Sequence, residues 1–250
     1  MSERLEILDC CALYGRPAVP VGEPYLRPAD LLAEMDRLGI AERWCADFRA
    51  LENSPALGNR LLVGELAGHP RLHPVWTVLP PGTGELPPPG ELLAAMAGSG
   101  VRMVRAEPKR HGYSVADWCS GELWAALERC RAPVLLDAAD EWDPLEAMLS
   151  AHPELPVILT NVGYRSARVL YPLLERHRNL RLETSTYLVN EGLAEVARRF
   201  GVARLLFGSG SPGLSAEAAL GTLRFAGLAA GDLAAVAGGN LRALLAEVVP

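Results

Sequence analysis

The sequence predicts an α/β fold, a single (β/α)8 TIM barrel, as one domain over residues 1–250. The first observation is length, because 250 residues is the usual size of such a barrel. The second is composition: 50% of the residues are hydrophobic and 22% are charged, which is enough apolar material for a large core. The third is an alternation of short apolar runs with helical patterns, which is typical of a parallel sheet covered by helices.

Short runs with the composition of β-strands occur along the whole chain, in the number that a barrel needs. They are residues 5–11, 41–47, 73–79, 101–107, 132–138, 156–162, 180–186 and 203–209. Helical patterns lie between them, and the first, at 28–39, begins with Pro28 and ends at Gly39, as helices commonly do. The Pro- and Gly-rich segment 79–91 is interpreted as a loop at the barrel mouth. The last helix, at 233–248, is expected to pack on the outside.

Charge and chain ends exclude several classes of protein. A formal net charge of −6 without a basic stripe argues against nucleic-acid binding. The first residues lack the basic start and apolar core of a secretory signal, and no run of about 18 apolar residues occurs. We therefore expect a cytoplasmic protein that binds no membrane. The cysteines form an odd set without CxxC spacing and are expected to be reduced thiols.

Seven motifs follow one another in a familiar order. They are ILDCCALYG, PADLLAEMDRLGI, GNRLLVGELAGHPRLHPVWTVLPP, APVLLDA, PVILTNVG, ARLLFGSGSP and GGNLRALL. Together they resemble the metal-dependent amidohydrolase-related barrels, the family that contains aminocarboxymuconate semialdehyde decarboxylase. The first is similar to that family's I-D-x-H-x-H-x-G and the sixth to its R-x-L-F-G-S-D-x-P. The resemblance implies a barrel with hydrolase or carboxy-lyase chemistry and a zinc ion at its mouth.

The positions that match the family's metal ligands carry other residues. The opening histidines correspond to Cys11 and Leu13, the strand-five histidine to Asp137, the strand-six histidine to Asn161, and the closing aspartate to Gly210. A catalytic zinc takes about three protein ligands, and the side chains of Leu13 and Gly210 can supply none. We therefore assign no metal ligand and expect no cofactor.

Histidines elsewhere in the chain do not restore the site. His69, His73, His152 and His177 come before or at the start of predicted strands, so they belong to the end of the barrel opposite the chemistry. Only His111 follows a strand.

The predicted mouth is nevertheless polar. Strand ends and the loops after them supply Cys11, Asp47, Arg105, Glu107, Lys109, Asp137, Asp140, Glu141, Asn161, Tyr164, Arg165, Glu183, Ser185 and Ser209. We assign catalytic roles to Asp137 and Asn161, and ligand-binding roles to Cys11, Arg105, Glu107, Asp137, Asn161, Arg165, Glu183 and Ser209. The alternatives are simple burial for Cys11, an ion pair with Arg105 or another mouth arginine for Asp137, and solvated or paired carboxylates for Glu107 and Glu183.

Three functions remain open. The favoured one is a degenerate member of the family, a pseudoenzyme that binds a small organic molecule or a partner. The second is metal-free hydrolase or decarboxylase chemistry, with Asp137, Glu107 or Glu183 as the base and arginines holding an anionic substrate. The third is an unusual metal held by Cys11 and carboxylates. The expected partner is a small molecule in the barrel mouth, and homodimer formation is left open.

Overall fold

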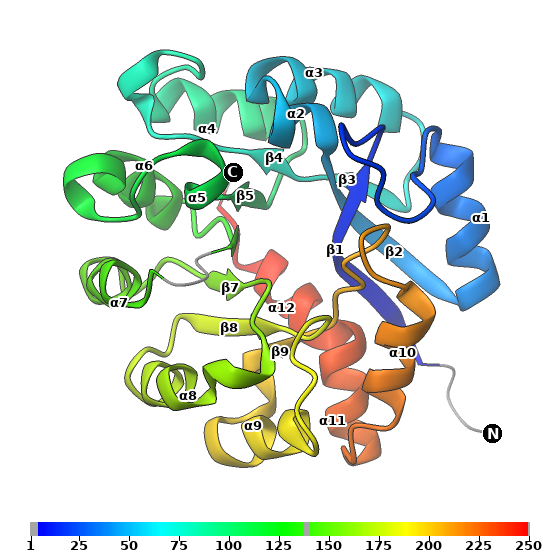
Figure 1. The fold of residues 1–250 in the computed structure, drawn as a ribbon. Coiled ribbons are helices and arrows are strands. Elements are labelled where there is room, and N and C mark those ends of the chain that lie inside the picture. The colour runs from blue at the N-terminus through cyan, green and yellow to red at the C-terminus, as the bar shows by residue number, and fades with distance from the viewer. Residues whose placement is uncertain (1–4, 138–140, 250) are drawn as a thin grey trace.

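The computed structural model, which describes residues 5–137 and 141–249, has the predicted barrel architecture (Figure 1). Its strands are β1 (Ile7–Tyr14), β2 (Ile40–Asp47), β3 (Leu72–Pro74), β4 (Trp76–Thr77), β5 (Val104–Ala106), β6 (Val134–Leu136), β7 (Val157–Leu159), β8 (Leu180–Glu183) and β9 (Leu205–Leu206). Their pairings are parallel. Each predicted strand overlaps one of these, and β3 and β4 are the two halves of the third.

Backbone hydrogen bonds close the ring where the strand ladders are interrupted. Val75, between β3 and β4, donates its N–H to the carbonyl of Cys45 over 2.8 Å. At the seam between β9 and β1, the N–H of Cys10 donates to Phe207 O over 3.0 Å, and the N–H of Gly210 donates to Cys11 O over 2.8 Å. The sheet therefore has no free edge at this seam.

The helices connect the strands, and most of them surround the ring on the outside (Figure 1). They are α1 (Pro28–Leu38), α2 (Phe48–Glu52), α3 (Pro55–Leu66), α4 (Pro89–Gly98), α5 (Pro108–His111), α6 (Asp117–Arg129), α7 (Trp142–Ala151), α8 (Ala167–Arg176), α9 (Gly192–Phe200), α10 (Ala216–Arg224), α11 (Ala230–Ala234) and α12 (Asn240–Ala246). In the described part of the chain, none of them combines the length and apolarity needed to cross a membrane.

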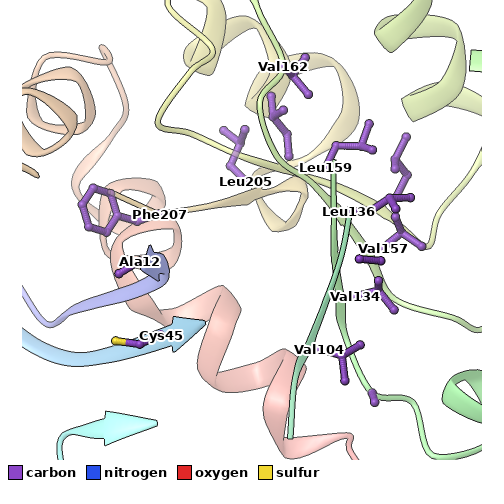
Figure 2. Packing of buried hydrophobic residues seen from close by; sticks show 14 of the residues in the cluster. Ala12, Cys45, Val104, Val134, Leu136, Val157, Leu159, Val162, Leu205 and Phe207 are labelled. Atoms are coloured by element: carbon purple, nitrogen blue, oxygen red, sulfur yellow. The ribbon is translucent and has the colours of Figure 1, made fainter. Parts of the chain in front are cut away.

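The core has two layers because side chains alternate along each strand. Residues such as Val134, Leu136, Val157 and Leu159 point outward and pack beneath the helices, as Figure 2 shows. A second cluster takes the opposite faces of the same strands and fills the barrel interior. Its members include Leu8, Cys10, Cys11, Trp44, Ala46, Val75, Met103, Leu135, Ile158 and Leu206.

The last helix packs differently from the expectation. Leu241, Leu244 and Leu245 of α12 belong to the interior cluster, and Figure 1 shows α12 crossing the centre of the ring in that view. The prediction that this helix lies on the outside is therefore wrong. Its apolar stripe covers the end of the barrel at which the strands begin, and the interior is closed at that end.

Gly58 provides a test of how tightly the outer layer is packed. A Cβ atom at this position of α3 would lie 2.2 Å from the backbone nitrogen of Ala50 in α2. We expect Gly58→Ala to lower the free energy of unfolding by about 1–3 kcal/mol, since the two backbones would have to separate. Urea unfolding measures this change.

The same helix supplies the control. A Cβ atom at Gly64 would meet nothing within 4 Å in the described chain beyond the backbone of its own helix. Because alanine favours a helix over glycine by up to about 1 kcal/mol, Gly64→Ala should leave stability unchanged or raise it. Equal effects of the two substitutions would refute the close approach of α2 and α3.

Candidate functional site

A β-bulge in β1 sets the layout of the mouth. The register against β2 shifts between Asp9, opposite Arg43, and Ala12, opposite Cys45. The extra residue lets Cys10 and Cys11 both join the interior cluster, and Leu13 packs against that cluster. Cys11 and Leu13, which the motif resemblance matches to the family's opening histidines, thus both face the barrel interior.

Asp9 holds this bulge against the opposite side of the seam. Its carboxylate is fully buried and accepts hydrogen bonds from the N–H of Cys11 (3.2 Å) and from the N–H and hydroxyl of Ser209 (2.8 and 2.7 Å). The Nε of Arg43, also fully buried, lies 2.9 Å from it. Arg43 in turn donates to Glu34 of α1. The network joins β1, β2, α1 and the segment after β9.

The structure buries the side chain of Ser209, for which the sequence predicts a ligand contact. Its hydroxyl is engaged with Asp9 and Ser211. Ser209 therefore stabilises the seam of the barrel.

Arg105 brings a positive charge to the top of the interior. It follows Val104 on β5, is only 9% exposed, and places Nη1 3.4 Å from the sulfur of Cys11. Its Nε donates to Glu107 over 2.6 Å, and Arg110 donates to the other oxygen of Glu107. Burial raises the pKa of Glu107, but the two arginines outweigh this and hold the pKa below its usual value. Glu107 is thus a paired carboxylate, which makes it a poor base.

Cys11 is a protonated thiol in this setting. Burial raises its pKa to about 12, and the lowering influence of Arg105 offsets only part of the effect. Thiolates are the reactive and metal-binding form of cysteine. Cys11 therefore acts as a small buried group beside a guanidinium, and all five cysteines are free, as expected.

Glu183 is the buried carboxyl at the end of β8. Its side chain accepts hydrogen bonds from the N–H (2.6 Å) and hydroxyl (2.7 Å) of Ser185, and Gly208 leaves it space that a Cβ atom would remove. Burial raises its pKa to about 7 despite these bonds. Its pKa also responds to the charges of Asp9 and Arg105, so Glu183 belongs to the same electrostatic centre.

Asp137 and Asn161, the predicted catalytic pair, lie together at the ends of β6 and β7. Asn161 donates its amide to Asp137 over 3.3 Å. Its φ of 58° is in the left-handed region, which asparagine tolerates better than most residues, and its side chain is exposed. Asp137 is partly exposed. The nearby Asp140 lies outside the described residues.

Arg165 lies away from the buried centre. It is exposed in the turn after β7, and its guanidinium lies over the ring of the exposed Tyr164 at 5.3 Å.

The histidines lie where the sequence predicts them. His73 is in β3 at the start of the third strand, whereas His152 and His177 end α7 and α8. His111 is the histidine of the mouth.

The donors at the mouth do not fit the family's metal centre. Cys11 is protonated and faces a guanidinium, and Leu13 and Gly210 have no donor side chain. Across residues 5–137 and 141–249, no group of three or more His, Cys, Asp or Glu side chains is arranged to hold a metal ion.

Comparison with known proteins identifies the family. A model of the amidohydrolase family matches residues 13–246. A search of curated proteins gives no match. Among solved structures, a TIM-barrel protein from Bordetella bronchiseptica, described as uncharacterized, is similar with a TM-score of 0.74 and 19% identity, over 97% of this chain and 99% of the other.

Two decarboxylases are also similar in fold. The 2,6-dihydroxybenzoate decarboxylase from Rhizobium has a TM-score of 0.73 and 15% identity, over 97% of this chain and 99% of its own. A dihydroxybenzoic acid decarboxylase from Polaromonas, solved with manganese and an inhibitor, 2-nitroresorcinol, has a TM-score of 0.75 and 13% identity, over 97% of each chain. At these identities the structures agree in fold, and the family match extends over most of the sequence. This chain belongs to the amidohydrolase family.

Proposed function

We propose that this protein binds a small organic molecule at the mouth of its barrel and uses no catalytic metal there. The observation that carries the proposal is the contact between Arg105 and Cys11, with Nη1 3.4 Å from the sulfur. The motif resemblance matches Cys11 to the family's first histidine ligand. A fixed guanidinium at this distance would repel a divalent cation in a buried setting, where charges interact more strongly than in water. The same cation favours an anionic ligand.

A cavity at the mouth supports binding. It has a volume of about 360 Å³, within the range of small-molecule sites, and Arg110, His111 and Glu52 are among its lining residues. Arg110 also contacts Glu107, the partner of Arg105, so the cavity is linked to the buried centre.

His111 provides a polar contact in this cavity. Its Nε2 lies 2.9 Å from the carbonyl oxygen of Leu51, and since that oxygen can only accept, Nε2 carries a proton. Its Nδ1 is buried and has no partner among the described residues.

Metal analysis of the purified protein tests the proposal. We expect well under one transition metal per chain, and no rise in melting temperature on adding Mn²⁺ or Zn²⁺, because too few donors converge. Single substitutions of Cys11→His or Asp137→His should leave the metal content unchanged. A stoichiometric metal that is lost on Cys11→Ala or Asp137→Ala would instead support the unusual metal site.

Ligand binding is the second half of this test. We expect small molecules, whether they co-purify or are added, to bind at the mouth. The substitution Arg110→Gln should weaken this binding. Arg198→Gln, on the exposed face of α9, is the matched control. Binding that is insensitive to Arg110→Gln contradicts the mouth cavity as the site.

One observation favours a second candidate, metal-free acid–base chemistry on an anionic small molecule. Glu183 is a buried carboxyl with a pKa near 7, which suits proton transfer at neutral pH. In that case turnover should depend on a group titrating near pH 7, and Glu183→Gln should abolish it. Turnover that survives Glu183→Gln removes Glu183 from the candidates for the base.

A further inference from the structure

At the end of the barrel opposite the mouth, two neighbouring cavities share part of their lining. The larger, about 470 Å³, lies between α4, the residues before β5 and β6, and the tail after α12. The smaller, about 340 Å³, lies between the first residues of β1 to β3 and α12. Gly100 and Arg102 line both. The cavities therefore adjoin at Arg102.

The larger cavity is apolar. Leu93, Met96 and Ala97 of α4 form one wall, and Val248 and Val249 of the tail form another. Its described lining contains no acidic side chain, and Arg102 is its one charged residue. A long hydrocarbon group fits such a lining, because burial of apolar surface is favourable by about 25 cal/mol per Å².

The smaller cavity is polar. The ring of His73 stacks on the indole of Trp44 at 4.2 Å, and Glu42 contacts His73 at 2.6 Å. The other oxygen of Glu42 accepts from Arg242 over 3.0 Å. The one carboxylate lining this cavity is thus held by two partners, whereas the guanidinium of Arg102 reaches a neutral acceptor, the carbonyl of Leu245. Positive charge is in excess at the junction of the cavities.

We propose that these adjoining cavities form a second binding site, for a free aliphatic carboxylate. Its hydrocarbon chain lies in the larger cavity along α4, and its carboxylate pairs with Arg102 at the junction. A cationic head group would be repelled by Arg102 and would find no unpaired carboxylate in the cavity lining. A neutral chain would form no ion pair with the guanidinium of Arg102. This site is at the opposite end of the barrel from the mouth, so it is independent of the proposed function.

Calorimetric titration of the full chain with decanoate, below its micelle concentration, tests the site. We expect saturable binding of one decanoate per chain. Arg102→Gln should weaken it about tenfold or more, because an ionic hydrogen bond contributes roughly 1.5–3 kcal/mol. Decanol, which has the same chain without the charge, should bind more weakly than decanoate.

Variants on α4 separate this site from non-specific association. Ala97→Trp fills the larger cavity from an exposed position and should abolish binding, and Ala94→Trp, on the same lining, is a second such variant. Ala95→Trp is the matched control, because Ala95 lines a different cavity, between α3 and α4. Three outcomes would overturn the proposal: no saturable binding, binding unchanged by Ala97→Trp and Arg102→Gln, or equal weakening by Ala95→Trp. If the wild-type chain instead self-associates and decanoate does not compete, the surface is an interface between copies and the carboxylate site is wrong.

Discussion

Asp9→Ala is expected to lower the free energy of unfolding by about 3–5 kcal/mol, the usual result of removing one partner of a buried ion pair. The loss has two sources. Arg43 would keep its buried charge without the carboxylate at 2.9 Å, and the N–H groups of Cys11 and Ser209 would lose their acceptor. Burial lowers the pKa of Arg43, but Asp9 and other neighbours more than offset this, so the guanidinium stays charged and cannot escape the cost by losing its proton.

Urea unfolding measures this effect, and Asp36→Ala is the matched control. Asp36 also pairs with an arginine, Arg71, at 2.6 Å, but its side chain is 67% exposed. Exposed pairs contribute at most about 1 kcal/mol. If Asp9→Ala cost no more than Asp36→Ala, the network at the seam would not be what holds β1 against β9.

The seam illustrates what local sequence patterns leave out. Apolar runs place the strands well: the predicted run 180–186 begins where β8 begins, because alternating side chains must fill both layers of the core. The contact between Asp9 and Ser209 joins residues 200 positions apart in the sequence. No local pattern indicates which of several polar residues at strand ends will meet across the barrel. Ser209 was therefore predicted to contact a ligand.

Other features of the mouth follow from short-range rules. Arg105 lies on β5, and Glu107 follows two positions later, just past the end of the strand at Ala106, so the two side chains are close enough to pair. From the sequence, Arg105 is expected to bind a ligand, and an ion pair with Arg105 or another mouth arginine is the alternative for Asp137. The bulge in β1 is harder to predict from the sequence, because nothing in the Cys10–Cys11 pair indicates that both side chains will point inward. β1 also runs on to Tyr14, beyond the predicted end at residue 11.

The last helix shows a further limit. Leu241, Leu244 and Leu245 have the spacing of an amphipathic helix, which predicts that one face is buried. Periodicity cannot say whether that face meets the outer wall or an open end of the ring. In the structure this face packs against the interior residues at the open end of the ring.

The pH dependence of stability should change when Glu183 is replaced by glutamine. A glutamate in an unfolded chain titrates near pH 4.3, whereas burial raises the pKa of Glu183 to about 7 in the folded protein. Between these values the folded state holds a proton that the unfolded state has lost, so this group makes stability fall as pH rises. The contribution is fully present below the unfolded pKa and is lost as pH rises through about 7.

Glutamine keeps the shape of the protonated carboxyl and can still accept from the N–H of Ser185. We therefore expect Glu183→Gln to gain stability relative to the wild type as pH rises, by about 3 kcal/mol between about pH 5 and about pH 8 at 1.36 kcal/mol per pKa unit. Urea unfolding at about pH 5 and about pH 8 gives this difference directly. Glu195→Gln, at an exposed pair with Arg198 on α9, is the control and should follow the wild-type profile closely. If the Glu183→Gln and wild-type profiles ran parallel, Glu183 would be ionised at neutral pH like an ordinary carboxylate, and the second candidate function would lose its proton-transfer group.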